Sequence, residues 1–347
     1  MIESVSELNS LCASLQNSKF IAIDTEFKRV DTFLPVLCLI QISDGQNISI
    51  IDPIKLNDLS ALKKLITNTQ ICWVFHSARQ DLEVLYQYFG VLPKKIFDTQ
   101  IAANFLNFNY QISYQNLLKN VLDVVIEKKY TRIDWSKRPL PIGAIEYAAD
   151  DVRYLLNLKN LLEKELVKEK KMDWVNEDFE SILNLTLYQP DIFDGWKKVK
   201  GFSGINKNKY KYAFAISAWR EQKAIKRDKP RKWIMSDEQI HSLISENYSL
   251  SRINQRDLEI FCEHFKNEIN NFKFDKTLTK LSKSESEQKK QLQSSLVSVA
   301  NKYNLKPEVL FNKKSIISFI KTRQKANFQS GWRYSLLKEE LSKWETF

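Results

Sequence analysis

The 347-residue sequence lacks the features of zinc-thiolate, secreted and membrane proteins. Its four cysteines are scattered and none forms a Cys-x-x-Cys pair, which argues against a zinc site and predicts free thiols in a reducing compartment. No apolar run approaches the ~20 residues of a membrane span. The first four residues include an acid and do not resemble a signal-peptide core. We therefore expect a cytoplasmic protein with no membrane partner.

The formal net charge of +11 arises entirely in the C-terminal half of the chain. Residues 1–170 contain 20 Lys+Arg and 20 Asp+Glu, which leaves 33 and 22 for residues 171–347. A neutral first half and a basic second half favour a catalytic unit followed by a unit that holds a polyanion. A solvated, basic helical surface is the alternative interpretation.

The N-terminal half alternates strand-like and helix-like patterns. The predicted strands cover residues 20–27, 36–42, 48–51, 71–75 and 96–97. The predicted helices cover residues 5–16, 56–67, 79–89, 100–106 and 113–122, with one more from residue 141 onward. The turn at residues 43–47 is a hairpin signal, so the first three strands are expected to form an antiparallel meander.

Two acidic residues close the first predicted strand. Asp24 and Glu26 follow the apolar run of residues 20–23 and lie two positions apart. Because side chains on a strand alternate with a period of two, both carboxylates face the same side. Hard divalent cations prefer such oxygen ligands, although a solvated strand end explains a single pair equally well.

Further carboxylates come from two other segments. Asp81 lies in the first turn of a predicted helix, where the helix dipole alone would favour an acid. Asp151 follows Tyr147 by four residues, so both lie on one helical face. Four carboxylates can hold two divalent ions about 4 Å apart, which is the arrangement used for phosphoryl transfer. Tyr147 would then orient or help to deprotonate the attacking water.

A basic, aromatic loop spans residues 128–139. It holds five cations and two aromatic residues in twelve positions. Cations that contact phosphates and rings that stack on bases are typical of single-strand binding, so this loop is a candidate RNA contact. Its candidate residues are Lys128, Arg132, Trp135 and Arg138. The alternative is a surface loop in which Trp135 fills a gap in the core.

The C-terminal half reads as helical. Residues 171–204 are expected to form a helical linker, and residues 210–227 a long helix that ends in a basic run. Residues 236–239 match a capping box, and the stretch 282–293 is interpreted as a low-complexity linker. Four cations of the basic run are candidate RNA ligands through counterion release: Lys226, Arg227, Arg231 and Lys232.

The ordered motifs resemble a known nuclease family. The carboxylates, with Tyr147, match the three exonuclease motifs of the DEDD superfamily, and the tyrosine is typical of its DEDDy branch. The DEDDh branch would have a histidine where Glu146 stands. Longer stretches resemble ribonuclease D: DTEF, LCLIQISDG, FHSARQDLEVL, FDTQIAANF, DWSKRPL and EYAADDVRYLL. The second half is similar to the helical HRDC domains of that family.

The resemblance implies an α/β ribonuclease H-like exonuclease domain, a mixed sheet flanked by helices, followed by two all-α HRDC-like helical domains. The expected boundaries are 1–170 for the exonuclease domain, 171–204 for the linker, and 205–282 and 286–347 for the HRDC-like domains. The implied activity is metal-dependent 3′-5′ exoribonuclease action that trims tRNA precursors and releases 5′-monophosphates. The implied catalytic residues are Asp24, Glu26, Asp81, Tyr147 and Asp151, and two Mg²⁺ or Mn²⁺ ions are expected on the four carboxylates.

Several alternatives stay open on this basis. A DNA 3′-5′ exonuclease of the proofreading or Werner type shares the catalytic motifs, and a non-catalytic RNA-binding protein would share the basic half. Asp150 stands where the family more often has alanine, and the spacing from Tyr147 favours Asp151 as the ligand. His76 ends a buried strand, which favours a supporting role over a general base. The expected partner is RNA, bound by a monomer.

Overall fold

A computed structural model describes residues 1–127, 129–130, 132–245, 255–275, 277, 279–322, 328 and 331–344. The chain divides into two compact units. The sheet unit comprises Met1–Lys28, Val36–Tyr188 and Leu281–Phe347, and the helical unit comprises Arg29–Pro35 and Gln189–Lys280. No helix among the described residues is both long and apolar enough to cross a bilayer.

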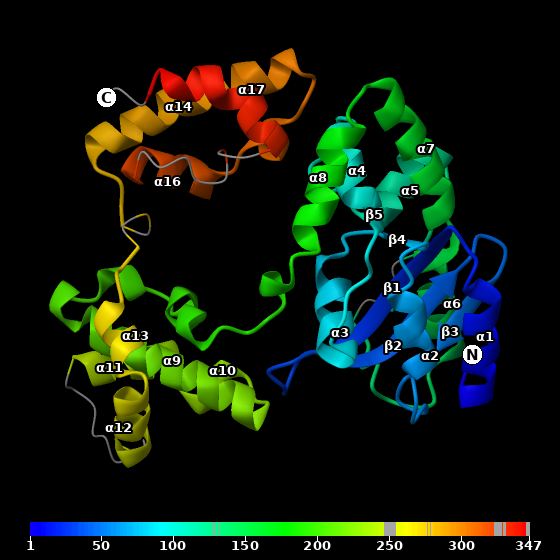
Figure 1. The fold of residues 1–347 in the computed structure, drawn as a ribbon, viewed down its shortest axis with the longest axis horizontal. Helices are drawn as coiled ribbons and strands as arrows, with labels where there is room; N and C mark the ends of the chain where they lie inside the picture. The colour runs from blue at the N-terminus through cyan, green and yellow to red at the C-terminus, as the bar shows by residue number, and fades with distance from the viewer. Residues whose placement is uncertain are drawn as a thin grey trace. The chain divides into compact units, whose positions relative to one another are not determined.

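The sheet unit is built on a mixed five-stranded sheet with the order β3-β2-β1-β4-β5 (Figure 1). The strands are β1 (Phe20–Lys28), β2 (Val36–Ser43), β3 (Ile48–Ile51), β4 (Cys72–Phe75) and β5 (Ile96–Asp98). Strands β1, β2 and β3 pair antiparallel, whereas β4 pairs parallel with both β1 and β5. The expected meander and mixed sheet are confirmed, and the acidic strand β1 lies at the centre.

Helices cover this sheet. They are α1 (Val5–Leu15), α2 (Ser60–Ile66), α3 (Arg79–Phe89), α4 (Thr99–Phe105), α5 (Tyr114–Leu122), α6 (Ile142–Arg153), α7 (Leu155–Lys168), α8 (Met172–Ile182) and η1 (Leu185–Leu187). The helix expected from residue 141 onward is therefore two helices that meet at Tyr154. The backbone N–H of Tyr154 donates to the hydroxyl of Tyr114, which itself donates to the carbonyl of Asp150.

The C-terminal helices pack into the same hydrophobic core as the sheet. They are α14 (Lys283–Lys302), α15 (Pro307–Leu310), α16 (Lys313–Thr322) and α17 (Gly331–Ser342). Trp332 stacks on Trp174 at 5.3 Å, and Lys171 donates to the carbonyls of Phe105 and Asn304. Gly331 has φ +72°, a backbone conformation that residues with a side chain rarely adopt, so the start of α17 favours glycine.

The interpretation of residues 282–293 as a linker is wrong. Ser282 caps α14 through a capping box with Glu285, and this 20-residue helix includes the rest of the stretch, residues 283–293. Its composition is polar because only Leu292, Leu296 and Ala300 are buried. A narrow apolar stripe of this kind is difficult to recognise in a low-complexity sequence, but it is enough to pack a helix against a hydrophobic core.

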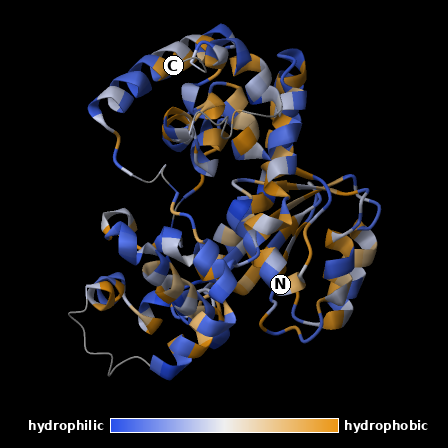
Figure 2. Ribbon diagram, turned by 60° about the vertical axis from the view of Figure 1, so that its left-hand side comes forward, coloured by the Kyte–Doolittle hydropathy of each residue, from blue (hydrophilic) through white to orange (hydrophobic). Residues whose placement is uncertain are grey.

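The helical unit has its own core. Its elements are η2 (Ile192–Lys198), η3 (Phe202–Gly204), η4 (Lys207–Lys209), α9 (Tyr210–Arg227), α10 (Arg231–Ile234), α11 (Asp237–Ile244), α12 (Gln255–His264) and α13 (Lys266–Asn271). The predicted helix 210–227 and the capping box at Ser236 are confirmed. Figure 2 shows hydrophobic and hydrophilic residues alternating along these helices, as amphipathic packing requires.

The observed division differs from the expected domain boundaries in three places. Residues 171–188 belong to the sheet unit and residues from 189 onward to the helical unit, so the expected linker 171–204 is split between them. The segment 286–347 groups with the sheet unit, while residues 29–35, between β1 and β2, group with the helical unit. Within that unit, Asp228 accepts the backbone N–H groups of Phe33 and Leu34. The HRDC character of the helices stays a prediction.

Candidate active site

Strand β1 presents the first two candidate ligands. Ile21, Ala22 and Ile23 are buried, while Asp24 and Glu26 are half-buried and Thr25 between them is buried. This alternation places both carboxylates on one side, as the strand period predicts. Strand β4 pairs with the start of β1 (Phe20 to Ala22), and β2 pairs with the part that carries the two acids (Ala22 to Lys28), so both neighbours hold β1 in the sheet.

Asp81 reaches the same region from α3. Its Oδ1 accepts from the backbone N–H of Thr25 at 3.2 Å and from the Thr25 hydroxyl at 2.6 Å. The start of α3 is fixed by Asp98, which accepts the N–H groups of Ser77 and Ala78 at 3.1 and 2.7 Å. Sequence reasoning missed both Thr25 and Asp98, although each lies inside a motif that it used.

Helix α6 supplies Asp151 and Tyr147. Asp24, Glu26 and Asp151 each offer a ligand atom, and these atoms all lie within 4.8 Å of one another. The neighbouring Asp150 instead accepts from Arg153 Nε at 2.6 Å. The structure thus brings together three of the four predicted ligands and places Asp81 against β1 beside them, while Asp150 faces a cation.

The electrostatics of this cluster are dominated by burial. Removal from water, followed by the charges of Asp81, Asp151 and Glu26, raises the pKa of Asp24 well above its ordinary value. Burial and neighbouring carboxylates raise the pKa of Glu26 to about 8 and the pKa values of Asp81 and Asp151 to about 7. Burial and then Asp151 raise the pKa of Tyr147, which keeps its phenol protonated at neutral pH.

Such a donor set fits a divalent cation. Three convergent carboxylates are hard oxygen ligands, and within the described part of the chain no ion pair joins any of them to a basic side chain. Buried like charges that lack a counterion are stabilised most directly by a bound cation. The carboxylate cluster is therefore a candidate metal site.

His76 has a supporting place, in agreement with the sequence-based interpretation. Its Nδ1 lies 2.9 Å from the Thr99 hydroxyl and its Nε2 lies 3.0 Å from the carbonyl of Ile112. Burial lowers the pKa of the imidazole, although the charge of Asp98 opposes this. With both ring nitrogens engaged, His76 links the end of β4 to α4 and the segment before α5.

The basic loop differs from its predicted role at two residues. The ring of Trp135 is only 4% exposed, so it has no free face for a base and the core-filling alternative applies. The guanidinium of Arg138 donates to Asp52 and to the carbonyls of Cys38 and Trp135, which removes it from phosphate binding. Arg132 is exposed, and Lys128 lies outside the described residues.

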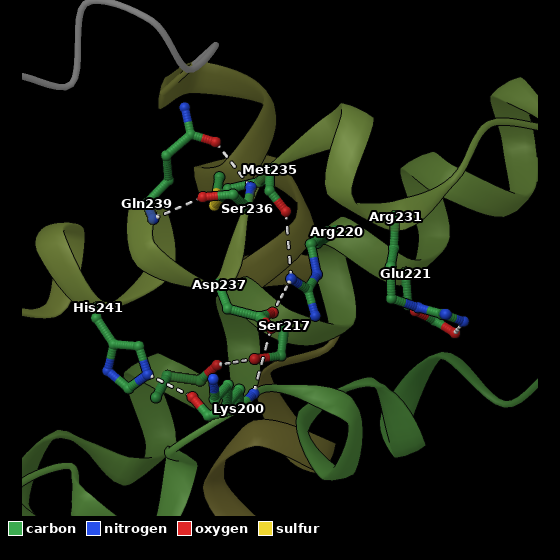
Figure 3. A network of polar contacts seen from close by, with 11 residues as sticks. Lys200, Ser217, Arg220, Glu221, Arg231, Met235, Ser236, Asp237, Gln239 and His241 are labelled. Atoms are coloured by element: carbon green, nitrogen blue, oxygen red, sulfur yellow. Dashed lines mark hydrogen bonds and ion pairs between the residues drawn. The ribbon is translucent and has the colours of Figure 1, made fainter. Parts of the chain in front are cut away.

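The four candidate cations of the basic run in the helical unit also differ in their surroundings: one is paired and three are exposed. Figure 3 shows Arg231 beside the buried Glu221, to which its Nε and Nη2 both donate at 2.9 Å. Lys226, Arg227 and Lys232 are exposed. So is Trp233, whose ring is 64% exposed and lies 5.8 Å from the ammonium of Lys229. The tryptophan was missed because burial is the usual expectation for an aromatic residue on a helix.

Comparisons with known proteins agree with this geometry. The sequence model of the 3′-5′ exonuclease family matches residues 1–167. Residues 1–167, in the sheet unit, are thus similar to the 3′-5′ exonuclease family, whose members depend on divalent metal ions. Within that family the chain is similar to ribonuclease D. It is 39% identical over 240 residues to ribonuclease D of Bartonella henselae, which covers 69% of this chain and 59% of the relative.

Other relatives extend the likeness. Ribonuclease D of Acidiphilium cryptum is 36% identical over 244 residues, covering 70% of this chain and 62% of that protein. The chain thus spans about three fifths of the length of the curated relatives it matches. The crystal structure of Escherichia coli RNase D, an exoribonuclease involved in structured RNA processing, superposes with a TM-score of 0.85 at 24% identity, covering 99% of this chain and 97% of that one. The two proteins share their fold over nearly their whole lengths.

Proposed function

We propose that this protein is a metal-dependent 3′-5′ exoribonuclease of the ribonuclease D type, which removes 3′-terminal nucleotides as 5′-monophosphates. The observation that carries the proposal is the convergence of Asp24, Glu26 and Asp151, from two separate elements, to ligand atoms within 4.8 Å. The names of its relatives support RNA over DNA as the substrate.

In this proposal Asp24, Glu26, Asp81 and Asp151 hold two Mg²⁺ or Mn²⁺ ions. Such ions activate water and neutralise charge that develops on a phosphodiester. Thr25 orients Asp81 by donating to its Oδ1, which leaves Oδ2 available. Tyr147, protonated because burial raises its pKa, orients the attacking water by a hydrogen bond. Attack at the last phosphodiester releases the terminal nucleotide with its phosphate.

The RNA body is proposed to bind exposed cations of both units. The exposed candidates are Arg132 from the loop and Lys226, Arg227 and Lys232 from the helical unit. Lys128, which lies outside the described residues, stays a candidate from the sequence. Trp233 is an additional candidate because an exposed ring beside lysines offers a stacking surface. Arg231 is a weaker candidate since Glu221 engages its guanidinium. We keep precursor tRNA as the proposed substrate, and the cytoplasmic location and monomeric state remain predictions.

One assay tests the activity. A 5′-labelled tRNA precursor with a 3′ extension, the same molecule with a 2′-deoxy 3′ terminus, and single-stranded DNA are each incubated with Mg²⁺, Mn²⁺ or EDTA. We expect stepwise shortening from the 3′ end of the RNA, none in EDTA, and nucleoside 5′-monophosphates as products. Equal or faster shortening of DNA would assign the protein to the DNA exonucleases, and metal-independent binding without cleavage would assign it to non-catalytic RNA-binding proteins.

The helical unit is tested by binding. Lys226→Ala, Arg227→Ala and Lys232→Ala together remove three exposed cations, so we expect the RNA dissociation constant to rise and its slope against salt concentration to fall by roughly 2 to 3. Lys197→Ala is the matched control because Lys197 is also exposed in the helical unit but is paired with Asp194. An unchanged salt slope in the triple variant would contradict the proposed RNA surface.

A further inference from the structure

The ring of Trp135 lies against the ring of Tyr147. Their centroids are 6.3 Å apart and their planes differ by 29°. Trp135 belongs to a loop outside any helix or strand, yet only 4% of it is exposed. It shares a small hydrophobic cluster with residues of β2, β3 and α6. A loop residue this well buried next to a site residue needs anchors that hold the loop in place.

Arg138 supplies those anchors. Its Nε donates to Asp52 Oδ2 at 2.5 Å and its Nη2 to Asp52 Oδ1 at 2.7 Å. Its Nη1 donates to the carbonyl of Trp135 at 2.7 Å, and its Nη2 also donates to the carbonyl of Cys38 at 2.7 Å. The planar fork of arginine makes such a set directional, so one side chain fixes the loop backbone at Trp135 to strand β2 and to the end of β3.

Asp52 is suited to receive this arginine. It is fully buried directly after β3, and its Oδ1 also accepts the N–H of Ile54 at 3.0 Å. Burial raises the pKa of Asp52, but the hydrogen bonds and charge of Arg138 outweigh this and lower it overall. The pair is thus a fixed, ionised contact between the loop and the same sheet that carries Asp24.

A second ring from this loop also contacts Tyr147. The ring of Tyr130 lies 6.3 Å from that of Tyr147 with the planes 58° apart. Gly143 on α6 permits this approach, because a Cβ at that position would collide with the Tyr130 hydroxyl. Two aromatic contacts restrict both the rotation of the Tyr147 side chain and the position of its ring.

We propose that Trp135 is a positioning residue that fixes the phenol of Tyr147 relative to the carboxylate cluster, and that the Arg138–Asp52 pair holds Trp135 there. The inference rests on the proposed function, since it takes the role of Tyr147 as given. Its physical basis is that a misplacement of about 1 Å in a catalytic group can cost up to about 10²-fold in rate. The DWSKRPL segment then serves the catalytic site, rather than contacting RNA through Trp135 and Arg138.

A double-mutant cycle tests the proposal with single-stranded oligoribonucleotide and Mn²⁺. We expect Trp135→Ala to lower kcat by about tenfold with little change in KM, and Trp135→Phe to restore most of it. In the Tyr147→Phe background, Trp135→Ala should lower kcat by less than about twofold, because the group it positions is already gone. Mn²⁺ affinity, measured by calorimetry without RNA, should match that of the wild type in all these variants.

Arg138→Lys provides a second route should Trp135→Ala fail to fold. It keeps the charge and the Trp135 ring but removes the fork, so we expect a fall of several-fold in kcat that also vanishes in the Tyr147→Phe background. Trp174→Ala is the matched control, because it removes another ring of the sheet unit, one that stacks on Trp332. It should lower the melting temperature and leave kcat within about twofold.

The outcomes separate the two proposals. An equal fall in kcat for Trp135→Ala or Arg138→Lys with and without the Tyr147 hydroxyl would overturn the positioning role while leaving the nuclease assignment intact. An unchanged kcat in both variants would do the same. A wild-type protein without metal-dependent cleavage would instead remove the proposed nuclease activity. A Tyr147→Phe variant as fast as the wild type would remove the proposed role of Tyr147, on which the inference also rests.

Discussion

The carboxylate cluster of the sheet unit and the buried ion pairs of the helical unit handle buried charge in opposite ways. In the sheet unit, Asp24, Glu26 and Asp151 converge, and none has a basic partner within the described part of the chain. In the helical unit, the fully buried Glu221 accepts from Lys198 and Arg231, and the fully buried Arg220 donates to Asp237 at 2.7 Å (Figure 3).

The pKa values follow this difference. Burial raises the pKa values in both clusters, but in the helical unit the hydrogen bonds from Arg231 and Lys198 to Glu221, and from Arg220 to Asp237, outweigh burial and lower them. At Glu26 in the carboxylate cluster of the sheet unit no such partner offsets burial, and the pKa of Glu26 rises to about 8. A buried charge that is paired with an opposite charge can serve the stability of the fold. A buried cluster of negative charges without such a partner indicates a binding site for a cation from outside the chain.

The dependence of stability on pH has opposite signs at the carboxylate cluster and at the ion pairs of the helical unit. Between about pH 4.5 and 8 the folded sheet unit keeps a proton on Glu26 that the unfolded chain releases, so the free energy of unfolding falls as pH rises. Lowered pKa values make Glu221 and Asp237 contribute stability above the pKa values of the unfolded chain, and that contribution is lost as pH falls.

The largest effect is expected from removing one ligand of the unpaired cluster. Asp24→Asn keeps the shape of the side chain but loses its charge, so we expect the rate of RNA shortening to fall by about 10³-fold, or about 4 kcal/mol of barrier. Asp150→Asn is the matched control on the same exonuclease domain, since Asp150 pairs with Arg153, and it should stay within about threefold of the wild type. Full activity in Asp24→Asn would place the catalytic site elsewhere.

The next largest effect is expected from breaking an ion pair in the helical unit. Arg220→Leu leaves Asp237 with an uncompensated charge, so we expect a loss of about 3 kcal/mol in the free energy of unfolding. Urea denaturation read by hydrogen exchange of residues 210–227 measures it. The double variant Arg220→Leu/Asp237→Leu should recover much of the loss, because neither charge of this pair then remains buried. A loss below about 0.5 kcal/mol in the single variant would mean that the pair is not a structural contact.

Metal addition sharpens the comparison further. Because Asp81 and Asp151 have pKa values of about 7 and Glu26 of about 8, protons compete with cations at this site below neutral pH. Mn²⁺ in excess should raise the melting temperature by roughly 3 °C at pH 8 and by much less at pH 5.5. Scanning calorimetry measures both, and an equal rise in Asp24→Asn would show that the ion binds outside the cluster.

The smallest effect is a gain in stability. In EDTA at pH 8, Asp24→Asn removes one of several mutually repelling buried charges, so we expect it to raise the free energy of unfolding of the sheet unit by about 1 kcal/mol. The gain should shrink toward pH 5 as the wild-type carboxyls take up protons. Urea denaturation at both pH values tests this, and a destabilised variant at pH 8 would argue that Asp24 has a compensating partner.

The identities and order of the candidate ligands were predictable from sequence because strand and helix periodicity are local. A spacing of two residues on a strand places Asp24 and Glu26 on the same side. A spacing of four residues on a helix places Tyr147 and Asp151 on one face. The resemblance to a family supplied the rest of the set and its chemistry. The central sheet and the 210–227 helix followed from the same local patterns.

The use of each basic or aromatic side chain was decided only by tertiary structure. Arg138 meets Asp52 across 86 residues of sequence, and Arg231 meets a Glu221 whose burial no local pattern indicates. From composition alone such residues are predicted to bind nucleic acid. Their burial and their ion pairs in the tertiary structure show that they stabilise the fold instead. The stretch 282–293 follows the same rule, since its one apolar residue, Leu292, packs into the core of the sheet unit, which composition does not indicate. Sequence thus determined which carboxylates are available, and packing determined which charges stay unpaired to bind something else.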